Sequence, residues 1–291
     1  MRVCPAKGRS TTMRTMVTAP LSFVDPPMQA LTEWPRTVRH PIAGVLTDID
    51  DTLTRDGQME PVALAALHAL HDAGVPVIAI TGRPAGWSEP FALQWPVQSI
   101  VAENGSLRLQ NKQGLLQKHY TQTTEQRHAN HRHLQAVLNA IEHQVPGAVR
   151  AQDSAGRETD IAIDHSEYAH LSPDRIEQVV QRMRGAGLTA TVSSIHINGW
   201  MGEHNKWTGA QWAVQELLGR DLTLELEHWV YVGDSTNDQI MFQHMPLTVG
   251  VANIRRFVDQ LTHLPRFVTE GERGAGFAQV AAHVLLGLGQ T

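Results

Sequence analysis

Asp48 and Asp50 are the two residues of this sequence whose types and spacing most directly suggest chemistry. They open the segment 48–54 (Asp-Ile-Asp-Asp-Thr-Leu-Thr), which follows a short apolar run at 42–47. Residues two positions apart in an extended segment point to the same side, so both carboxylates can share one site. Two clustered carboxylates repel each other unless a divalent cation neutralises them or one is protonated. The pair suits a nucleophile beside a general acid and base; an acidic solvated loop is the alternative.

A second acidic cluster follows a later apolar run. Gly233, after Val-Tyr-Val at 230–232, leaves room for the close approach of backbone or ligand, and Asp234 and Asp238 come next. Hard cations such as Mg²⁺ bind oxygen ligands. Asp234 is therefore a candidate metal ligand, with Asp238 in support. A helix cap at Asp234 or Asn237 is the alternative.

Thr81 and Lys206 are the remaining candidates for chemistry. Thr81 ends a strand-like run at 75–80, and Lys206 stands near the start of an expected helix at 206–218. A hydroxyl and an ammonium group can bind phosphoryl oxygens, and the ammonium group offsets the charge that develops in phosphoryl transfer. Taken singly, a residue such as Thr81 is more often a turn residue and one such as Lys206 a solvated helix residue.

The elements that must position these residues alternate between strand and helix. Strands are expected at 42–47, 75–80, 99–102, 228–232 and 247–251, with helices between them from about 61, 206 and 237. This alternation predicts an α/β fold with a doubly wound, parallel-sheet (Rossmann-like) core. Ligands of such sheets bind at the carboxyl ends of the strands, where the candidate residues stand.

An inserted domain interrupts this pattern between Thr81 and Lys206. Hairpin and helix signals without parallel alternation predict an α+β cap at 106–202, which splits the core into 41–105 and 203–291. Residues 1–40 hold five prolines and little periodicity, so we expect a disordered extension there.

Together and in this order, the four segments resemble the haloacid dehalogenase-like hydrolases. The pattern of that superfamily is Asp-x-Asp-x-Thr, then Thr or Ser, then Lys, then Gly-Asp-x-x-x-Asp. The resemblance implies a Mg²⁺-dependent phosphatase in which Asp48 attacks phosphorus and Asp50 acts as general acid and then as base. Thr81 and Lys206 would hold the phosphoryl group, and Asp234 would bind Mg²⁺.

The resemblance also implies roles for the neighbours of these residues. Asp48 and the backbone carbonyl of Asp50 would complete the protein ligands of the metal, while Asn237 and Asp238 would hold the metal shell or the lysine. The run Thr-Gly-Arg-Pro at 81–84 makes Gly82 and Arg83 candidate substrate contacts. The matching region extends from about residue 42 to residue 286.

The insert resembles the large α+β cap of one branch of the superfamily, subfamily IIB. That branch includes the Cof-type, sucrose-phosphate and mannosyl-3-phosphoglycerate phosphatases, and most known members act on sugar phosphates. The resemblance thus implies that the substrate is a small phosphorylated metabolite, most simply a sugar phosphate. On alternating cap positions, Arg157, His196, Asn198 and Trp200 are candidates to read its hydroxyl groups or a second anionic group; the alternative is an ordinary polar sheet face.

The charged-residue composition limits the kinds of partner that we expect for this protein. The formal charge of −5 comes from 29 acidic and 24 basic residues without a long run of one sign, so we expect neither nucleic acid nor a membrane surface as a partner. The lone cysteine, Cys4, and the lack of an apolar leader favour the cytoplasm. We expect a monomer or a homodimer.

Two other functions remain open at this stage. A phosphomutase of the phosphomannomutase type uses a similar nucleophile and cap. A non-catalytic phospho-accepting signalling or binding protein also combines clustered Asp, Thr and Lys on a doubly wound sheet, but it would carry an Asp where this chain has Thr81, and it gives the cap no purpose.

Overall fold

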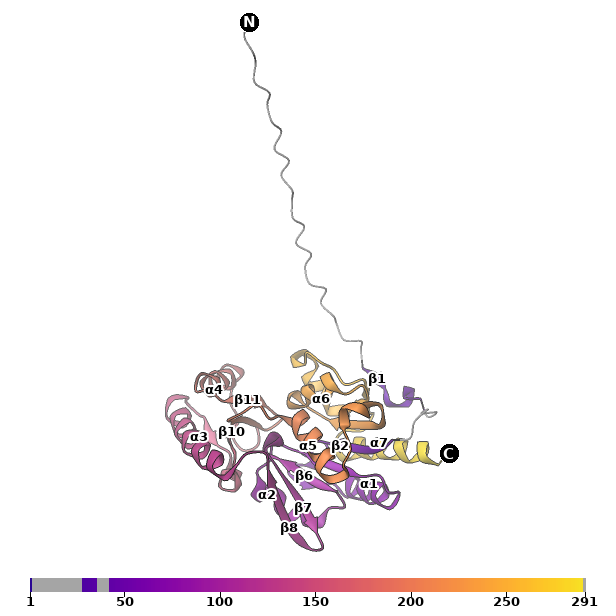
Figure 1. Cartoon of the computed structure of the whole chain (residues 1–291). Coiled ribbons are helices and arrows are strands. Elements are labelled where there is room, and N and C mark those ends of the chain that lie inside the picture. The colour runs from indigo at the N-terminus through magenta and orange to yellow at the C-terminus, as the bar shows by residue number, and fades with distance from the viewer. Residues whose placement is uncertain (2–27, 36–41, 290–291) are drawn as a thin grey trace.

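Figure 1 shows the computed structural model, which describes Met1 and residues 28–35 and 42–289. A nine-stranded sheet forms the larger part, in the order β1-β15-β14-β13-β2-β5-β6-β7-β8. Its strands are β1 (Gln29–Ala30), β2 (Gly44–Thr47), β5 (Val77–Ile80), β6 (Ser99–Ala102), β7 (Leu107–Lys112), β8 (Leu115–Tyr120), β13 (Trp229–Gly233), β14 (Thr248–Gly250) and β15 (Phe267–Val268).

Helices cover both faces of this sheet. In the spatial order β1-β15-β14-β13-β2-β5-β6, every pair of neighbouring strands is parallel. Val45 of β2 packs with the face covered by α1 (Pro61–Asp72), α2 (Ala85–Gln94) and α7 (Arg273–Leu288). The next residue, Leu46, packs with the face covered by α5 (Lys206–Leu218) and α6 (Gln239–His244). Alternate side chains of buried parallel strands point to opposite faces, and the predicted doubly wound α/β core is confirmed.

A second lobe holds the predicted α+β insert. Its antiparallel sheet has the order β11-β12-β10-β9 and packs against two helices through a hydrophobic core of its own. Figure 1 shows this lobe beside the core, with α3 and α4 on its outer side. Its elements are α3 (Thr124–Gln144), β9 (Val149–Arg150), β10 (Asp160–Asp164), α4 (Pro173–Gly185), β11 (Thr189–Val192) and β12 (His196–Trp200).

The boundary of the insert differs from the expected residue 106. The hairpin β7–β8 was expected to belong to the cap, but β7 pairs antiparallel with β6 and extends the core sheet. Leu107 and Leu109 are buried in the core on the α2 side. The cap therefore starts after Tyr120. A hairpin pattern in the sequence does not reveal which sheet the hairpin joins.

Part of the expected extension at 1–40 is also structured. Gln29 and Ala30 of β1 pair with β15, and Trp34 is buried and stacks on Phe267 with ring centroids 5.8 Å apart. A strand of two residues is too short to show the alternation of polar and apolar residues by which a strand is recognised in a sequence. Residues 2–27 and 36–41, including Cys4, lie outside the described part of the chain.

A small hairpin, β3 (Thr54–Arg55) with β4 (Gln58–Met59), follows the acidic segment and contacts α7. Within the described residues, no helix combines the length and the apolar character needed to cross a membrane.

Candidate active site

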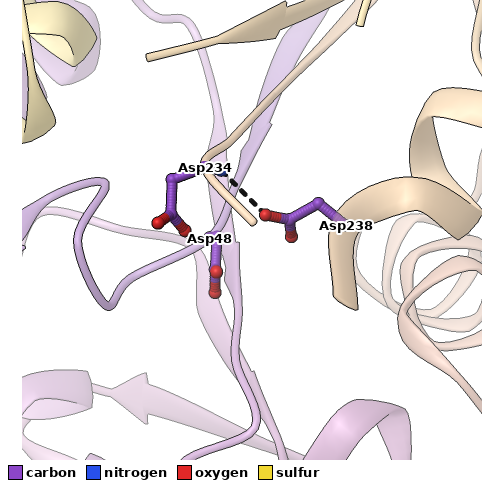
Figure 2. A group of neighbouring side chains, drawn as sticks. All are labelled: Asp48, Asp234 and Asp238. Carbon is purple, nitrogen blue, oxygen red and sulfur yellow. Dashed lines mark hydrogen bonds between the residues drawn. The ribbon is translucent and has the colours of Figure 1, made fainter. Parts of the chain in front are cut away.

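Three aspartates gather at the carboxyl ends of β2 and β13. Asp48 follows β2, Asp234 follows β13, and Asp238 lies in the turn before α6. Figure 2 shows their side chains lying close together, and one carboxylate oxygen from each lies within 4.8 Å of the others. All three residues are buried. Because β2 and β13 are parallel neighbours, their ends bring together residues that are far apart in the sequence.

Lys206 bridges two of these aspartates. It is the first residue of α5, whose N-terminus is capped by Asn205, and its side chain is only 2% exposed. Its Nζ lies 3.0 Å from Asp48 Oδ1 and 2.7 Å from Asp238 Oδ1. Burial alone would lower the pKa of Lys206, but the two carboxylates outweigh it and raise the pKa above its ordinary value. The ammonium group thus stays charged beside Asp48.

Asp238 uses both of its oxygens to hold other groups. Oδ1 accepts hydrogen bonds from Lys206 and from the hydroxyl of Tyr231, and Oδ2 accepts from the backbone N–H groups of Asp234 and Ser235 at 2.8 and 3.0 Å. Four donors occupy the lone pairs that a carboxylate offers. We therefore assign Asp238 to the support of Lys206, one of its two expected roles, rather than to direct metal binding.

Gly233 makes this arrangement sterically possible. A Cβ placed at this position would lie 2.5 Å from the carboxyl group of Asp238. Any larger residue would push that carboxylate away from the N–H groups it accepts. The close approach expected at this glycine is therefore present.

The remaining acceptor atoms fit a divalent cation. Asp234 Oδ2 accepts a hydrogen bond from the side chain of Asn253 at 3.0 Å, whereas Asp234 Oδ1 is buried without a hydrogen-bond partner. Burial, together with the charges of Asp238 and Asp48, raises the pKa of Asp234 well above its ordinary value. A hard cation beside Asp48 and Asp234 would supply the missing partner and offset the crowded negative charge.

Asp48 itself is held in place by backbone groups on both sides. Its Oδ1 accepts from the N–H of Ile49 at 2.8 Å, and its own N–H donates to the carbonyl of Val232 on β13. Burial, helped by Asp238 and Asp50, raises the pKa of Asp48 to about 8, although Lys206 opposes the shift. A cation would act against this rise and favour the ionised, nucleophilic form.

Asp50 turns away from this cluster. Its carboxylate accepts two hydrogen bonds from Arg83 Nε, at 2.9 and 3.1 Å. Its side chain is therefore not placed for the metal, and the expected contribution of Asp50 to the metal is restricted to its backbone carbonyl. Thr81 is fully buried at the end of β5, and its hydroxyl accepts from the N–H of Arg83 at 3.0 Å.

A hollow of about 10 Å³ lies next to Asp48 and is lined from both lobes. Core residues Gly82 and Asn237 line it, and so do His196 and Asn198 of the cap. The structure thus brings these four predicted residues close to Asp48. The cap lies closed over Asp48 in this arrangement.

Arg157 and Asn198 join the lobes rather than stand free. Arg157 donates to the carbonyl of Gly82 at 3.0 Å and forms an ion pair with Asp160 at 2.8 Å. Asn198 donates to the same carbonyl at 3.2 Å and to Asp160 at 2.9 Å. Arg157, expected to read the substrate, lines neither this hollow nor the larger cavity described below, because its guanidinium is committed to Asp160, Asp153 and Gly82.

Trp200 is likewise displaced from the expected role. It is 1% exposed, and its indole N–H donates to the carbonyl of His204 at 2.9 Å. Its alternating position on β12 was the reason to expect a ligand contact. That position shares its strand face with His196 and Asn198, opposite Ile197 of the cap core, and Trp200 is buried there against the segment that leads from the cap to α5.

Two cap acids that the sequence did not single out contact Arg83. Glu167 lies 2.8 Å and Asp153 3.2 Å from the guanidinium, which is 4% exposed. The backbone N–H groups at 166–169 all donate to the carboxylate of Asp164, which fixes the loop carrying Glu167. The sequence signal that could have identified Glu167 is the Asp-x-Ser-Glu turn at 164–167, directly after a predicted strand.

Glu103 is a further residue that sequence reasoning missed. Its fully buried carboxylate accepts from the N–H of Ala85 in the core and from the N–H groups of Glu158 and Thr159 in the cap. Its acidic side chain in fact connects the two lobes.

Glu167 gives a pH-dependent contribution to stability. Burial would raise its pKa, but hydrogen bonds from His196 and Arg83 prevail and lower the pKa from 4.5 to about 2. A depressed carboxyl pKa stabilises the fold above the unfolded value and loses that effect as pH falls. We expect Glu167→Gln to lower the free energy of unfolding by about 1–2 kcal/mol at pH 7. The deficit should shrink as pH falls from 4.5 towards 2.

Urea unfolding of the wild type and the variant between pH 7 and pH 3 measures this difference. Glu177→Gln, at an exposed position of α4, is the matched control and should change little at any pH. A deficit that is constant with pH would contradict the assignment to the Glu167 carboxylate.

Comparison with known proteins agrees with these observations. Residues 45–145 match the model of a family described as haloacid dehalogenase-like hydrolase. No curated protein matches the chain. The matched segment contains Asp48, Asp50 and Thr81, and the resemblance inferred from the motifs is confirmed.

Solved structures share the fold across both lobes. A protein from Thermoplasma acidophilum has a TM-score of 0.64 at 18% identity, with 85% of this chain and 100% of that chain covered. The sucrose-phosphatase of Synechocystis, solved with sucrose and phosphate, has a TM-score of 0.60 at 16% identity, covering 84% and 98%. The C-terminal domain of the trehalose-6-phosphate phosphatase of C. albicans has a TM-score of 0.58 at 14% identity, covering 85% and 92%.

Proposed function

We propose that this chain, a haloacid dehalogenase-like hydrolase, is a Mg²⁺-dependent phosphatase that hydrolyses a small phosphorylated metabolite, most simply a sugar phosphate. The observation that carries the proposal is the contact of Lys206 with Asp48 beside the free Oδ1 of Asp234. A nucleophile, a fixed positive charge and a vacant oxygen ligand lie together there. The phosphatases among the structural neighbours support the same reaction class.

The reaction proceeds in two displacements on this geometry. A carboxylate oxygen of Asp48 forms a bond to phosphorus while the bond from phosphorus to the leaving oxygen breaks, and Asp50 gives that oxygen a proton. Water then attacks the aspartyl-phosphate and gives its proton to Asp50, which releases inorganic phosphate and restores both carboxyl groups. Asp50 must exchange its contact with Arg83 for the leaving oxygen.

The other residues bind charge and exclude water. Lys206 and Thr81 would hold phosphoryl oxygens, with Lys206 kept in place by Asp238. Asp48, Asp234 and the backbone carbonyl of Asp50 would hold Mg²⁺, which supplies positive charge to the phosphoryl oxygens. His196 and Asn198 close the hollow from the cap side. A closed hollow keeps bulk water from the aspartyl-phosphate.

The proposal also covers the partners, the compartment and the oligomeric state of the protein. The net negative charge without a long run of one sign supports a small metabolite over nucleic acid or a membrane surface, and the single cysteine supports the cytoplasm. We also propose that the protein is a monomer or a homodimer, in which each chain supplies both the cap and the core of its own site.

The direct test is release of inorganic phosphate from a panel of sugar phosphates, phosphoglycolate and a chromogenic aryl phosphate. We expect turnover with Mg²⁺ and a loss of at least about 100-fold with a chelator, because removal of the cation leaves phosphoryl and aspartate charges uncompensated. Asp234→Asn should need more Mg²⁺ for half-maximal rate. Asp259→Asn, at an exposed position, is its control.

Other outcomes assign other functions. Transfer of phosphoryl groups between positions of a hexose bisphosphate, without phosphate release, would indicate the phosphomutase. Stable phosphorylation with no turnover of any ester would indicate the phospho-accepting protein.

A further inference from the structure

A cavity of about 380 Å³ lies between the core and the cap beside the candidate active site. It shares Asp50, Arg83, Ser194 and Ile195 with the small hollow next to Asp48. Its volume lies in the range of pockets that hold small molecules. Under the proposed function the leaving oxygen must reach Asp50, so the group attached to that oxygen occupies this cavity.

The charged groups of the cavity wall are mostly acidic. Four carboxylates line it, and two guanidinium groups oppose them. The acids are Asp50, Asp51, Asp56 and Glu167, and the bases are Arg83 and Arg273. The excess of negative charge is separate from the aspartates around Lys206, which a divalent cation would compensate.

Both arginines are already paired. The guanidinium of Arg83 lies 2.9 Å from Asp50 and 2.8 Å from Glu167, and that of Arg273 lies 2.6 Å from Asp51. The low pKa of Glu167, about 2, keeps this acid ionised at neutral pH. After Asp50 has left Arg83 for the leaving oxygen, an incoming phosphate or carboxylate would still have to displace Glu167 from Arg83 or Asp51 from Arg273 and leave that acid unpaired.

The same wall offers many acceptors to hydrogen-bond donors. Carboxylate oxygens accept from hydroxyl and ammonium groups. Tyr168, on the fixed loop beside Glu167, is 65% exposed at this wall and offers its ring as an apolar surface. A polar group with several donors and no negative charge fits these walls.

We infer that the leaving group of the substrate is neutral or positively charged and rich in hydroxyl or amino donors, and that a second anionic group is rejected at this cavity. The inference rests on the proposed function and narrows it. On this inference, monophosphates of sugars, polyols or amino sugars are substrates, whereas bisphosphates and phosphorylated acids are poor substrates. Of the two groups that the cap residues were expected to read, it favours the hydroxyl groups over a second anionic group.

The test compares glucose 6-phosphate, glucosamine 6-phosphate and glucose 1,6-bisphosphate with Mg²⁺ present. We measure kcat/KM, and for any ester that is not turned over, the inhibition constant against a chromogenic aryl phosphate. The bisphosphate should be at least about tenfold worse than both monophosphates, by the repulsion of like charges. Glu167→Gln should narrow this gap about threefold or more, and Glu177→Gln should leave it unchanged.

Each contrary result has a distinct meaning. Equal or better use of the bisphosphate, while the aryl phosphate is hydrolysed, overturns this inference alone. A uniform fall for all three sugars in Glu167→Gln shows that Glu167 only supports the fold and overturns its part in selecting charge. If no ester, including the aryl phosphate, is hydrolysed, the proposed function fails.

Discussion

Replacement of Asp48 by Asn should reduce phosphate release by about 10⁴-fold while the fold is retained. The amide keeps the size of the side chain but cannot form the acyl phosphate. Lys206 remains paired with Asp238 at 2.7 Å, so the buried ammonium group keeps a counter-ion. The loss should therefore fall on kcat, with little change in the melting temperature.

Two measurements check this result. Initial rates of phosphate release give the loss, and mass spectrometry of the acid-quenched protein reports a phosphoryl group on the peptide containing residue 48 in the wild type alone. Asp259→Asn, at an exposed position, should retain full activity. A variant of Asp48 that kept a tenth of the activity would exclude this residue as the nucleophile.

Replacement of Lys206 by Met should affect stability as well as rate. Lys206 is 2% exposed and compensates Asp48 and Asp238, both buried. Removing one partner of a buried ion pair typically costs about 3–5 kcal/mol, because the other charge is left uncompensated. We expect the metal-free variant to lose stability on that scale. Phosphate release should fall about 10³-fold, since the phosphoryl group loses its fixed cation.

Urea unfolding with and without Mg²⁺ measures the stability change. Mg²⁺ should stabilise Lys206→Met more than the wild type, because the cation replaces part of the missing charge. Lys112→Met, at the exposed end of β7, is the matched lysine control. If Lys206→Met were as stable as the wild type without metal, the bridge between the aspartates would not be the interaction that holds the site.

The central residues of the site were predictable because each follows a buried strand or begins a helix. Asp48 and Asp234 stand directly after the apolar runs of β2 and β13, and parallel strands place such ends side by side. Lys206 was found at the start of α5 for the same local reason. Residue type and strand period were enough to bring the two aspartates together, whereas the place of Lys206 beside them was implied by the resemblance.

The cap side of the site was less accessible to sequence reasoning. Glu167 reaches Arg83 only because the cap lies against the core, and no periodicity within either segment encodes that contact. The polar alternation that suggested Arg157 and Trp200 as substrate contacts was real, but their side chains bind backbone carbonyls at the junction between the lobes, those of Gly82 and His204. A local sequence pattern indicates which residues share one face of a strand, but it does not indicate which part of the protein packs against that face.

The split of the core has a consequence for how the protein is made. β2 pairs with β5, close along the chain, and with β13, which follows the entire cap. The cap packs around its own hydrophobic cluster of residues from one continuous stretch. During synthesis this lobe can consolidate while β2 still has one unpaired edge, the kind of edge that chaperones protect from aggregation. A nascent chain stopped before residue 229 would carry a finished cap and no catalytic pocket.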